Sequence, residues 1–240
     1  TIDDGPLRKA IAEAANAPAD LPIDAALQAV GADTADPALG AALAWLQATT
    51  GVDAKKASSW YPPTSLPDSL VGADGDLAGI VQDALNGVKV TLATPVSRIA
   101  YDDSGVSLRL GTGESLSFDR VIVTVRLGVL QQHAIEFSPA LPFSHRGAIA
   151  ALASGYVETV WLQFDHAFWS LAADIWHVVG GEGPVRTWLN LQPATGKPVL
   201  VGLIGGEDAE AFAKLDDAAA EATARESLVF FAGARATPSP

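Results

Sequence analysis

The segment of this sequence best suited to hold a small molecule is an apolar stretch followed by a short helical one. Residues 121–125 read VIVTV, without the polar alternation of a half-buried strand, and LGVL follows at 127–130. We therefore predict a strand over 120–125, buried on both faces of a parallel sheet. Because open α/β sheets bind ligands outside the carboxyl ends of their strands, Thr124 and Val125 are the first candidate ligand-binding residues.

The sequence lacks several common arrangements of catalytic residues. There is no cysteine, which excludes disulfides, thiolate metal sites and cysteine nucleophiles. No G-x-S-x-G motif occurs. We expect the pairs Asp102-Asp103 and Asp216-Asp217 to be turn and helix caps. The histidines lack the i, i+4 spacing of zinc ligands, so we predict no metal site; they are His133, His145, His166 and His177.

The composition bounds the class of protein. The chain has 240 residues, 49% of them hydrophobic, which allows one large domain or two small ones. A net charge of −13 would repel phosphate backbones, so we predict no nucleic-acid partner. The same charge could steer cationic amines toward the protein, or simply keep it soluble. The sequence leaves the oligomeric state open.

The sequence also bears on location and completeness. No apolar run is long enough to span a membrane, and TIDDG is not the start of a signal peptide. We therefore expect a cytoplasmic protein without a membrane partner. The sequence contains no methionine, so we expect it to be an internal piece of a longer protein.

Several elements are needed to position the apolar strand. Capping residues and apolar spacing predict three helices within 1–70, followed by a proline-rich loop and a helix from about 75 to 85. Strands are predicted at 89–92, 96–101 and 106–110, with glycine-containing hairpin turns. Beyond 131 we predict a helix at 145–153, then strands at 156–164, 176–179, 186–191 and 198–204, and helices at 208–214 and 217–233.

These elements predict an α/β (α+β) fold. A mixed β-sheet flanked by helices would be accompanied by a three-stranded meander and the returning strand at 120–125. We divide the chain into a helical region at 1–70, a region with helix, meander and returning strand at 71–130, and a region with sheet and helices at 131–240.

A series of short motifs over about 70–232 resembles the flavin-containing amine oxidases, the family of monoamine oxidases, polyamine oxidases and lysine-specific histone demethylases. Their order and spacing carry the resemblance. The motifs are Gly75, 94–99 (TPVSRI), 119–125 (DRVIVTV), 127–130 (LGVL), Phe137 with Pro139, Leu141 and Pro142, Ala148-Ile149, Gly155, Val160 with Leu162 and Phe164, Phe168-Trp169, and Gly206-Glu207 with Ala209.

The resemblance implies FAD as cofactor and a small-molecule amine as substrate. It implies that the backbone at Val96 binds the adenine, and that Thr124 and Val125 lie beneath the flavin. Arg126, where the family usually has proline, completes the candidate cofactor-binding set. The regions 1–70 and 131–240 would form the substrate domain, and 71–130 would belong to the FAD domain.

The resemblance also implies a catalytic position. Thr159 stands where the family usually has a lysine that holds a water at flavin N5, so we take it as the candidate catalytic residue. A hydroxyl can hold a water but brings no charge, and oxidase and dehydrogenase activity both stay open. In the family the substrate cavity is aromatic-lined, which makes Trp161 and Trp188 candidate cavity residues.

Two flavin-binding segments of the family are missing from these residues. No G-x-G-x-x-G follows a strand, and the sequence ends before the family's second flavin segment. We therefore expect the central, substrate-binding portion of an enzyme that oxidises an amine C–N bond, inactive by itself and unable to retain FAD. The alternatives are a non-catalytic binding domain of the same fold, or a flavoprotein of desaturase or protoporphyrinogen-oxidase type.

Overall fold

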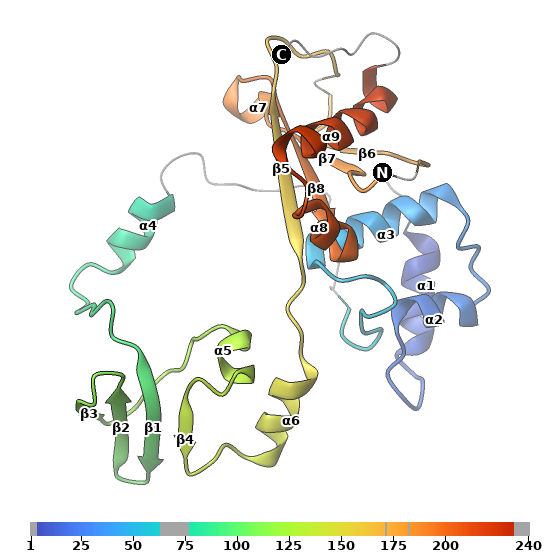
Figure 1. Cartoon of the computed structure of the whole chain (residues 1–240). Helices are drawn as coiled ribbons and strands as arrows, with labels where there is room; N and C mark the ends of the chain where they lie inside the picture. Colours follow the sequence, from blue (N-terminus) through green and yellow to red (C-terminus); the bar gives the residue numbers. More distant parts are fainter. Residues whose placement is uncertain (1–3, 63–76, 171, 182, 233–240) are drawn as a thin grey trace. The chain divides into compact units, whose positions relative to one another are not determined.

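The computed structural model describes residues 4–62, 77–170, 172–181 and 183–232 (Figure 1). The chain forms two compact units: a larger unit of Thr1–Asp74 with Gly155–Pro240, and a smaller unit of Gly75–Ser154. Each contains one four-stranded sheet with helices, which confirms the predicted mixed α/β class. The boundary expected after residue 70 lies outside the described residues, and the one after 130 falls within a short helix, Leu127–Gln131.

The N-terminal part of the larger unit is helical, as predicted. It contains α1 (Gly5–Ala14), α2 (Ile23–Ala29) and α3 (Pro37–Thr50). Asp36 caps α3, since its Oδ1 accepts a hydrogen bond of 2.9 Å from the Ala38 N–H. Gly51, at φ +71°, ends α3 in the left-handed conformation. Apolar side chains of the three helices form one core cluster; among its members are Leu7, Ala10, Ile23, Leu27, Leu39 and Leu46.

The sheet of the larger unit is antiparallel. Its strands are β5 (Val157–Gln163), β6 (Ile175–His177), β7 (Thr187–Asn190) and β8 (Val199–Gly205), in the order β5-β8-β7-β6. Figure 1 shows β5 at one edge, beside β8. Three helices accompany the sheet: α7 (Gln192–Thr195), α8 (Gly206–Phe212) and α9 (Asp217–Ala232). The predicted strands are confirmed within two residues at every end, whereas α7 was not expected.

One face of this sheet forms the main core of the larger unit. Trp188, Leu200 and Ile204 are at most 1% exposed and pack with Leu228 of α9. The other face carries α3, where the rings of Trp45 and His177 meet edge to face at 5.3 Å.

Glycines allow α3 to approach the sheet closely. A Cβ built on Gly205 would overlap the carbonyl of Gln47, and one on Gly155 would overlap the carbonyl of Thr50. Since these neighbours are backbone atoms of α3, a side chain could fit only if the helix moved. Gly155 was one of the resemblance motifs, and its position explains why glycine is needed there.

The sheet of the smaller unit has the order β3-β2-β1-β4. Its strands are β1 (Val96–Asp102), β2 (Gly105–Leu110), β3 (Ser115–Phe118) and β4 (Glu136–Ser138), with β1 and β4 parallel. Its helices are α4 (Leu77–Ala84), α5 (Leu127–Gln131) and α6 (Phe143–Ala151). The carboxylates expected to cap do so: Asp102 Oδ1 accepts from the Ser104 N–H at 2.7 Å, and Asp216 of the larger unit accepts from the Ala219 N–H at 2.8 Å.

The meander lies later in the sequence than predicted. Residues 89–92 are not a strand, because β1 already pairs with β2 on one side and with β4 on the other. The side chains of Val90 and Leu92 are 52% and 82% exposed. The third strand is instead β3, whose short SLSF sequence alternates polar and apolar residues but was not predicted as a strand.

The strand predicted over 120–125 is not formed. This segment has no regular structure, and its apolar side chains are exposed, with Ile122 at 87%. A strand exists only where a neighbour supplies hydrogen bonds, and no described strand pairs with this segment. The apolar face of α4 is exposed in the same way, with Leu77 at 64% and Ile80 at 59%.

Candidate functional site

Strand β5 brings two of the predicted site residues together. Successive side chains of a strand point to opposite faces, so Thr159 and Trp161 share one side of β5. Val160 and Leu162 point to the other side and pack against the core. The residues of the first side are exposed along the strand, and Trp161 is 63% exposed. We call this side, formed by Val157, Thr159, Trp161 and Gln163, the open face of β5.

A hydrogen bond joins the two candidates. The Trp161 Nε1–H donates to Thr159 Oγ1 at 3.2 Å. The candidate catalytic hydroxyl and a candidate cavity ring therefore form one unit on the open face of β5.

Trp188 lies elsewhere. It pairs with Gly202 of β8, which in turn pairs with Val160, so it occupies the core face of the sheet. Its side chain is 0% exposed, and its Nε1–H donates to the Ser227 hydroxyl of α9 at 2.9 Å. The structure does not bring Trp188 together with Thr159 and Trp161, and its role in a substrate cavity stays a prediction.

The predicted cofactor-binding residues lie in the smaller unit. Val96 begins β1 and pairs with Leu110 of β2. Thr124 and Val125 belong to the exposed segment before α5, and Arg126 is the residue that precedes the first turn of α5. Their assignment to the cofactor stays a prediction.

These residues offer polar groups to a ligand such as FAD. In the described part of the chain, the peptide groups of 120–125 have no backbone hydrogen-bond partners and are open to a ligand. The Thr124 hydroxyl and the Arg126 guanidinium add polar and cationic groups beside them. No described turn from a strand into a helix has the G-x-G-x-x-G spacing that would bind the pyrophosphate, including the turn at Gly205-Gly206 between β8 and α8. The chain thus offers contacts for one part of the cofactor.

Two hollows in the smaller unit contain none of the predicted site residues. One, of about 470 Å³, is lined mainly by β1, β2 and β3 and includes Tyr101, Asp102 and Asp119. The other, of about 400 Å³, is lined by apolar side chains of α5, β4 and α6, with Arg146 at its wall.

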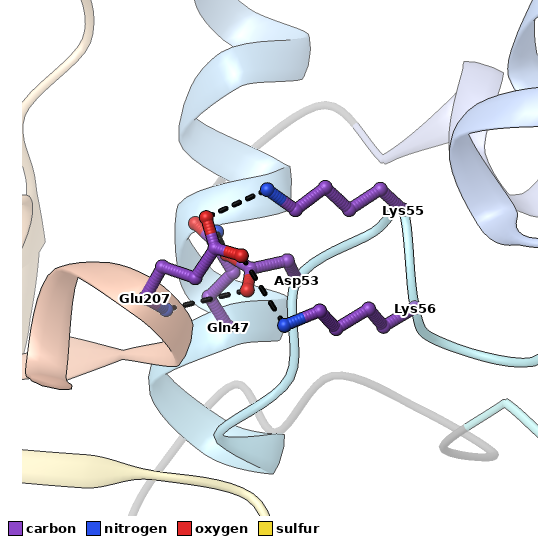
Figure 2. A network of polar contacts seen from close by, with 5 residues as sticks. All are labelled: Gln47, Asp53, Lys55, Lys56 and Glu207. Atoms are coloured by element: carbon purple, nitrogen blue, oxygen red, sulfur yellow. Dashed lines mark hydrogen bonds and ion pairs between the residues drawn. The ribbon is translucent and has the colours of Figure 1, made fainter.

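A polar network that the sequence did not predict joins the loop after α3 to α8 (Figure 2). Asp53 Oδ1 accepts from Gln47 Nε2 at 2.6 Å, and Asp53 Oδ2 accepts from the Glu207 N–H at 3.2 Å. Lys55 and Lys56 pair with the two carboxylate oxygens of Glu207, at 2.6 and 3.2 Å. Asp53 therefore caps α8 from a distant part of the chain. The resemblance motif Gly206-Glu207 was the available signal for this site.

The network explains the shifted pKa values of Glu207 and Lys55 and the need for glycine at position 206. Hydrogen bonds from Lys55 and Lys56 lower the pKa of Glu207, and the hydrogen bond to Glu207 raises the pKa of Lys55. Gly206 has φ +66°, and a Cβ there would lie 2.6 Å from Asp53 Oδ1. Only glycine places the α8 N-terminus against the Asp53 cap without strain.

His177 is a partly buried titratable group that packs against Trp45 of α3. Burial lowers its pKa from 6.5 to about 4. Its ring packs on Trp45, and its Nδ1 lies 3.2 Å from the Thr187 hydroxyl. The imidazole is therefore neutral at pH 7 and acts as a packing group.

We expect His177 to make the larger unit less stable in mild acid. Since the folded pKa is below the unfolded value, the unfolded state binds the proton first, and stability falls as the pH drops from about 6.5 toward 4. The loss is at most about 3 kcal/mol. Urea unfolding of wild type and His177→Gln at pH 7.5 and 4.5 measures it. The variant should lose less stability between the two pH values; equal losses would contradict the assignment.

The described part of the chain shows two further absences. No group of three or more His, Asp or Glu side chains within it could hold a metal ion. None of its helices is both long and apolar enough to cross a membrane.

Comparison with known proteins identifies a family. The model of the flavin containing amine oxidoreductases matches residues 18–239. Polyamine oxidase 4 of Oryza sativa subsp. japonica is 37% identical over 142 residues, which cover 58% of this chain and 28% of the relative. Lysine-specific histone demethylase 2 of Homo sapiens is 32% identical over 145 residues, which cover 58% of this chain and 18% of the relative. The chain thus spans less than a third of the length of these relatives.

Solved structures share the fold. Cyclohexylamine oxidase from Brevibacterium oxydans IH-35A matches 98% of this chain and 57% of its own, with a TM-score of 0.73 and 20% identity. A putrescine oxidase bound to putrescine matches 67% of this chain and 36% of its own, with a TM-score of 0.54 and 22% identity. At these identities the likeness concerns the fold alone.

Proposed function

Since this chain belongs to the flavin-containing amine oxidoreductase family, we propose that it is the substrate-binding and central portion of an enzyme that oxidises an amine C–N bond with FAD. The observation that carries the proposal is the family match over residues 18–239. The pairing of Thr159 with Trp161 on the open face of β5 supports it, because a polar group and an aromatic ring suit a site for an amine.

In such a reaction the carbon next to the amine nitrogen gives up a hydride equivalent and the nitrogen loses a proton, and water hydrolyses the resulting imine to a carbonyl compound and a smaller amine, or ammonia for a primary amine. Bound FAD would supply the acceptor for the hydride equivalent and a route for the electrons to oxygen or another acceptor. The residues of this chain would bind and orient the amine and restrict water at the open face of β5. The net charge of −13 favours the approach of cationic amines.

The substrate class follows from the relatives as a proposal. The similar proteins include polyamine oxidases and lysine-specific histone demethylases, whose names denote small polyamines and lysine side chains. We propose a small-molecule amine as substrate and a cytoplasmic location for the whole enzyme.

The test uses the longer protein with FAD bound. Anaerobic mixing with polyamines and with alkylamines should bleach the blue absorbance of the flavin. Bleaching by cyclic or polyene compounds but by no amine would instead support a desaturase or protoporphyrinogen-oxidase type of flavoprotein.

The side chain at position 159 affects which acceptor can reoxidise the reduced flavin. A hydroxyl at this position can hold a water but supplies no positive charge to favour reduced oxygen species. We propose that the enzyme reacts slowly with oxygen and prefers another acceptor. Turnover with oxygen and with a quinone dye, compared between wild type and Thr159→Lys, distinguishes oxidase from dehydrogenase.

We expect the isolated 240-residue chain not to bind FAD tightly, because a pyrophosphate-binding turn is not among its described elements. Added FAD should leave the melting temperature unchanged. A ligand present at 100 times its dissociation constant would stabilise the protein by about 2.7 kcal/mol, and the melting temperature would rise clearly. Parallel titrations with riboflavin and with ADP separate ring binding from nucleotide binding. A marked rise with FAD would contradict the expectation.

A further inference from the structure

The Thr159 hydroxyl on the open face of β5 accepts a hydrogen bond from Trp161. A threonine hydroxyl can donate one hydrogen bond and accept two, whereas an indole N–H can only donate. In the bond between the two side chains, Trp161 must therefore be the donor and Thr159 Oγ1 the acceptor. Among the described residues, Trp161 is the one side-chain partner of the Thr159 hydroxyl. The proton of that hydroxyl can therefore point away from Trp161.

The backbone of β5 holds the Thr159 and Trp161 side chains at a fixed spacing. Thr159 pairs with Leu203 and Trp161 pairs with Val201, both on β8, so a continuous ladder fixes the distance between the two side chains. Val201, which shares the side of the sheet with Trp161, is 2% exposed, so the neighbouring strand that holds β5 is firmly packed. By contrast, the indole of Trp161 is 63% exposed. An exposed hydrogen bond of 3.2 Å adds little to stability, so its effect is to orient the hydroxyl.

We propose that Trp161 is a positioning residue for Thr159. Its indole N–H occupies one lone pair of the Thr159 oxygen and directs the hydroxyl proton outward, so that the open face of β5 presents a hydrogen-bond donor beside an aromatic ring. A ligand or water in contact with this face meets the O–H of Thr159, and an ammonium group is attracted to the indole. The use of this donor in catalysis rests on the proposed function; the orientation itself does not.

The orientation is tested on the 240-residue chain by NMR of indole N–H groups. The chain has six tryptophans and gives six indole cross-peaks, and the peak of Trp161 is the one lost in Trp161→Phe. In Thr159→Val, which removes the hydroxyl but keeps the shape, the Trp161 proton should shift upfield. In Thr159→Ser, which restores a hydroxyl, it should return toward the wild-type position.

The Trp188 indole is the internal control. It donates to Ser227 on the opposite face of the sheet, so its peak should stay unchanged in Thr159→Val and move in Ser227→Ala. If the Trp161 peak stays at its wild-type position in Thr159→Val while the protein remains folded, the indole does not bond the hydroxyl and the proposal is overturned.

A double-mutant cycle in the longer, FAD-bound protein tests the functional use. Loss of the oriented donor in Thr159→Val should lower amine turnover about tenfold. Trp161→Phe should lower kcat by a smaller factor in wild type and leave kcat unchanged in the Thr159→Val background, whereas the weaker attraction of an ammonium to a phenyl ring should raise KM in both backgrounds. An equal effect of Trp161→Phe on kcat in both backgrounds would overturn the positioning role. Normal turnover in Thr159→Val, with the NMR result intact, would instead refute the catalytic role proposed for Thr159.

Discussion

Replacing Trp188 with alanine is expected to destabilise the larger unit by about 3–5 kcal/mol. The side chain is 0% exposed, lies at the centre of the core face of the sheet, and donates a hydrogen bond to Ser227 of α9. Truncation would leave a large cavity and remove the donor to the Ser227 hydroxyl, which would keep its own hydrogen bond of 3.0 Å to the Ala224 carbonyl. Urea denaturation followed by far-UV circular dichroism measures the change in unfolding free energy.

Trp161→Ala provides the matched control for this prediction. Trp161 belongs to the same sheet but lies on the open face of β5, where its side chain is 63% exposed. Its removal should cost less than about 1 kcal/mol, since little apolar surface leaves a packed environment. Similar losses for the two variants would contradict the assignment of Trp188 to the core and of Trp161 to an open surface.

Replacing Gly205 with alanine should destabilise the larger unit by at least about 3 kcal/mol. The backbone of Gly205 has φ −132° and ψ 165°, which any residue adopts, so the effect does not come from backbone strain. The loss of stability comes from a steric clash, because the new Cβ would overlap the carbonyl of Gln47 in α3. No side-chain rotation can relieve a clash with backbone, and α3 would have to move away from the sheet.

Gly40→Ala tests the same helix without the clash. A Cβ at Gly40 would lie 3.8 Å from the Arg186 guanidinium, which is an ordinary contact, and alanine favours a helix interior by about 0.5–1 kcal/mol over glycine. This variant should therefore be as stable as wild type or slightly more so. Thermal melts of both variants suffice; a Gly205→Ala protein as stable as wild type would show that α3 does not lie directly against β8.

Local signals predicted most of the secondary structure. The cap at Asp36 and the stop at Gly51 are properties of single residues and their neighbours, and the sequence predicted the helix between them. The strand predicted at 198–204 forms as β8 over Val199–Gly205, within one residue at each end. These signals do not depend on what the rest of the chain does.

Features that depend on distant partners were not predictable. The sequence 121–125 has a clear strand pattern, yet a strand needs a neighbour, and the described residues supply none. The Asp53 cap on α8 joins positions 154 residues apart, and nothing in the local sequence near Asp53 indicates it. For the candidate site, alternation placed Thr159 and Trp161 on one side of β5. The burial of Trp188 depended on the pairing of β7 with β8 and on α9.

The larger unit is interrupted in the sequence by the smaller one, and this has a consequence for protein synthesis. Helix α3 emerges from the ribosome first, but β8, which it covers, is translated only after Gly75–Ser154. At roughly 5–20 residues per second, translation of that stretch takes about 4–16 s. During this delay the nascent N-terminal helices expose the apolar surface that later meets the sheet. Chaperones that hold hydrophobic segments are therefore expected to act on this chain while it is still attached to the ribosome.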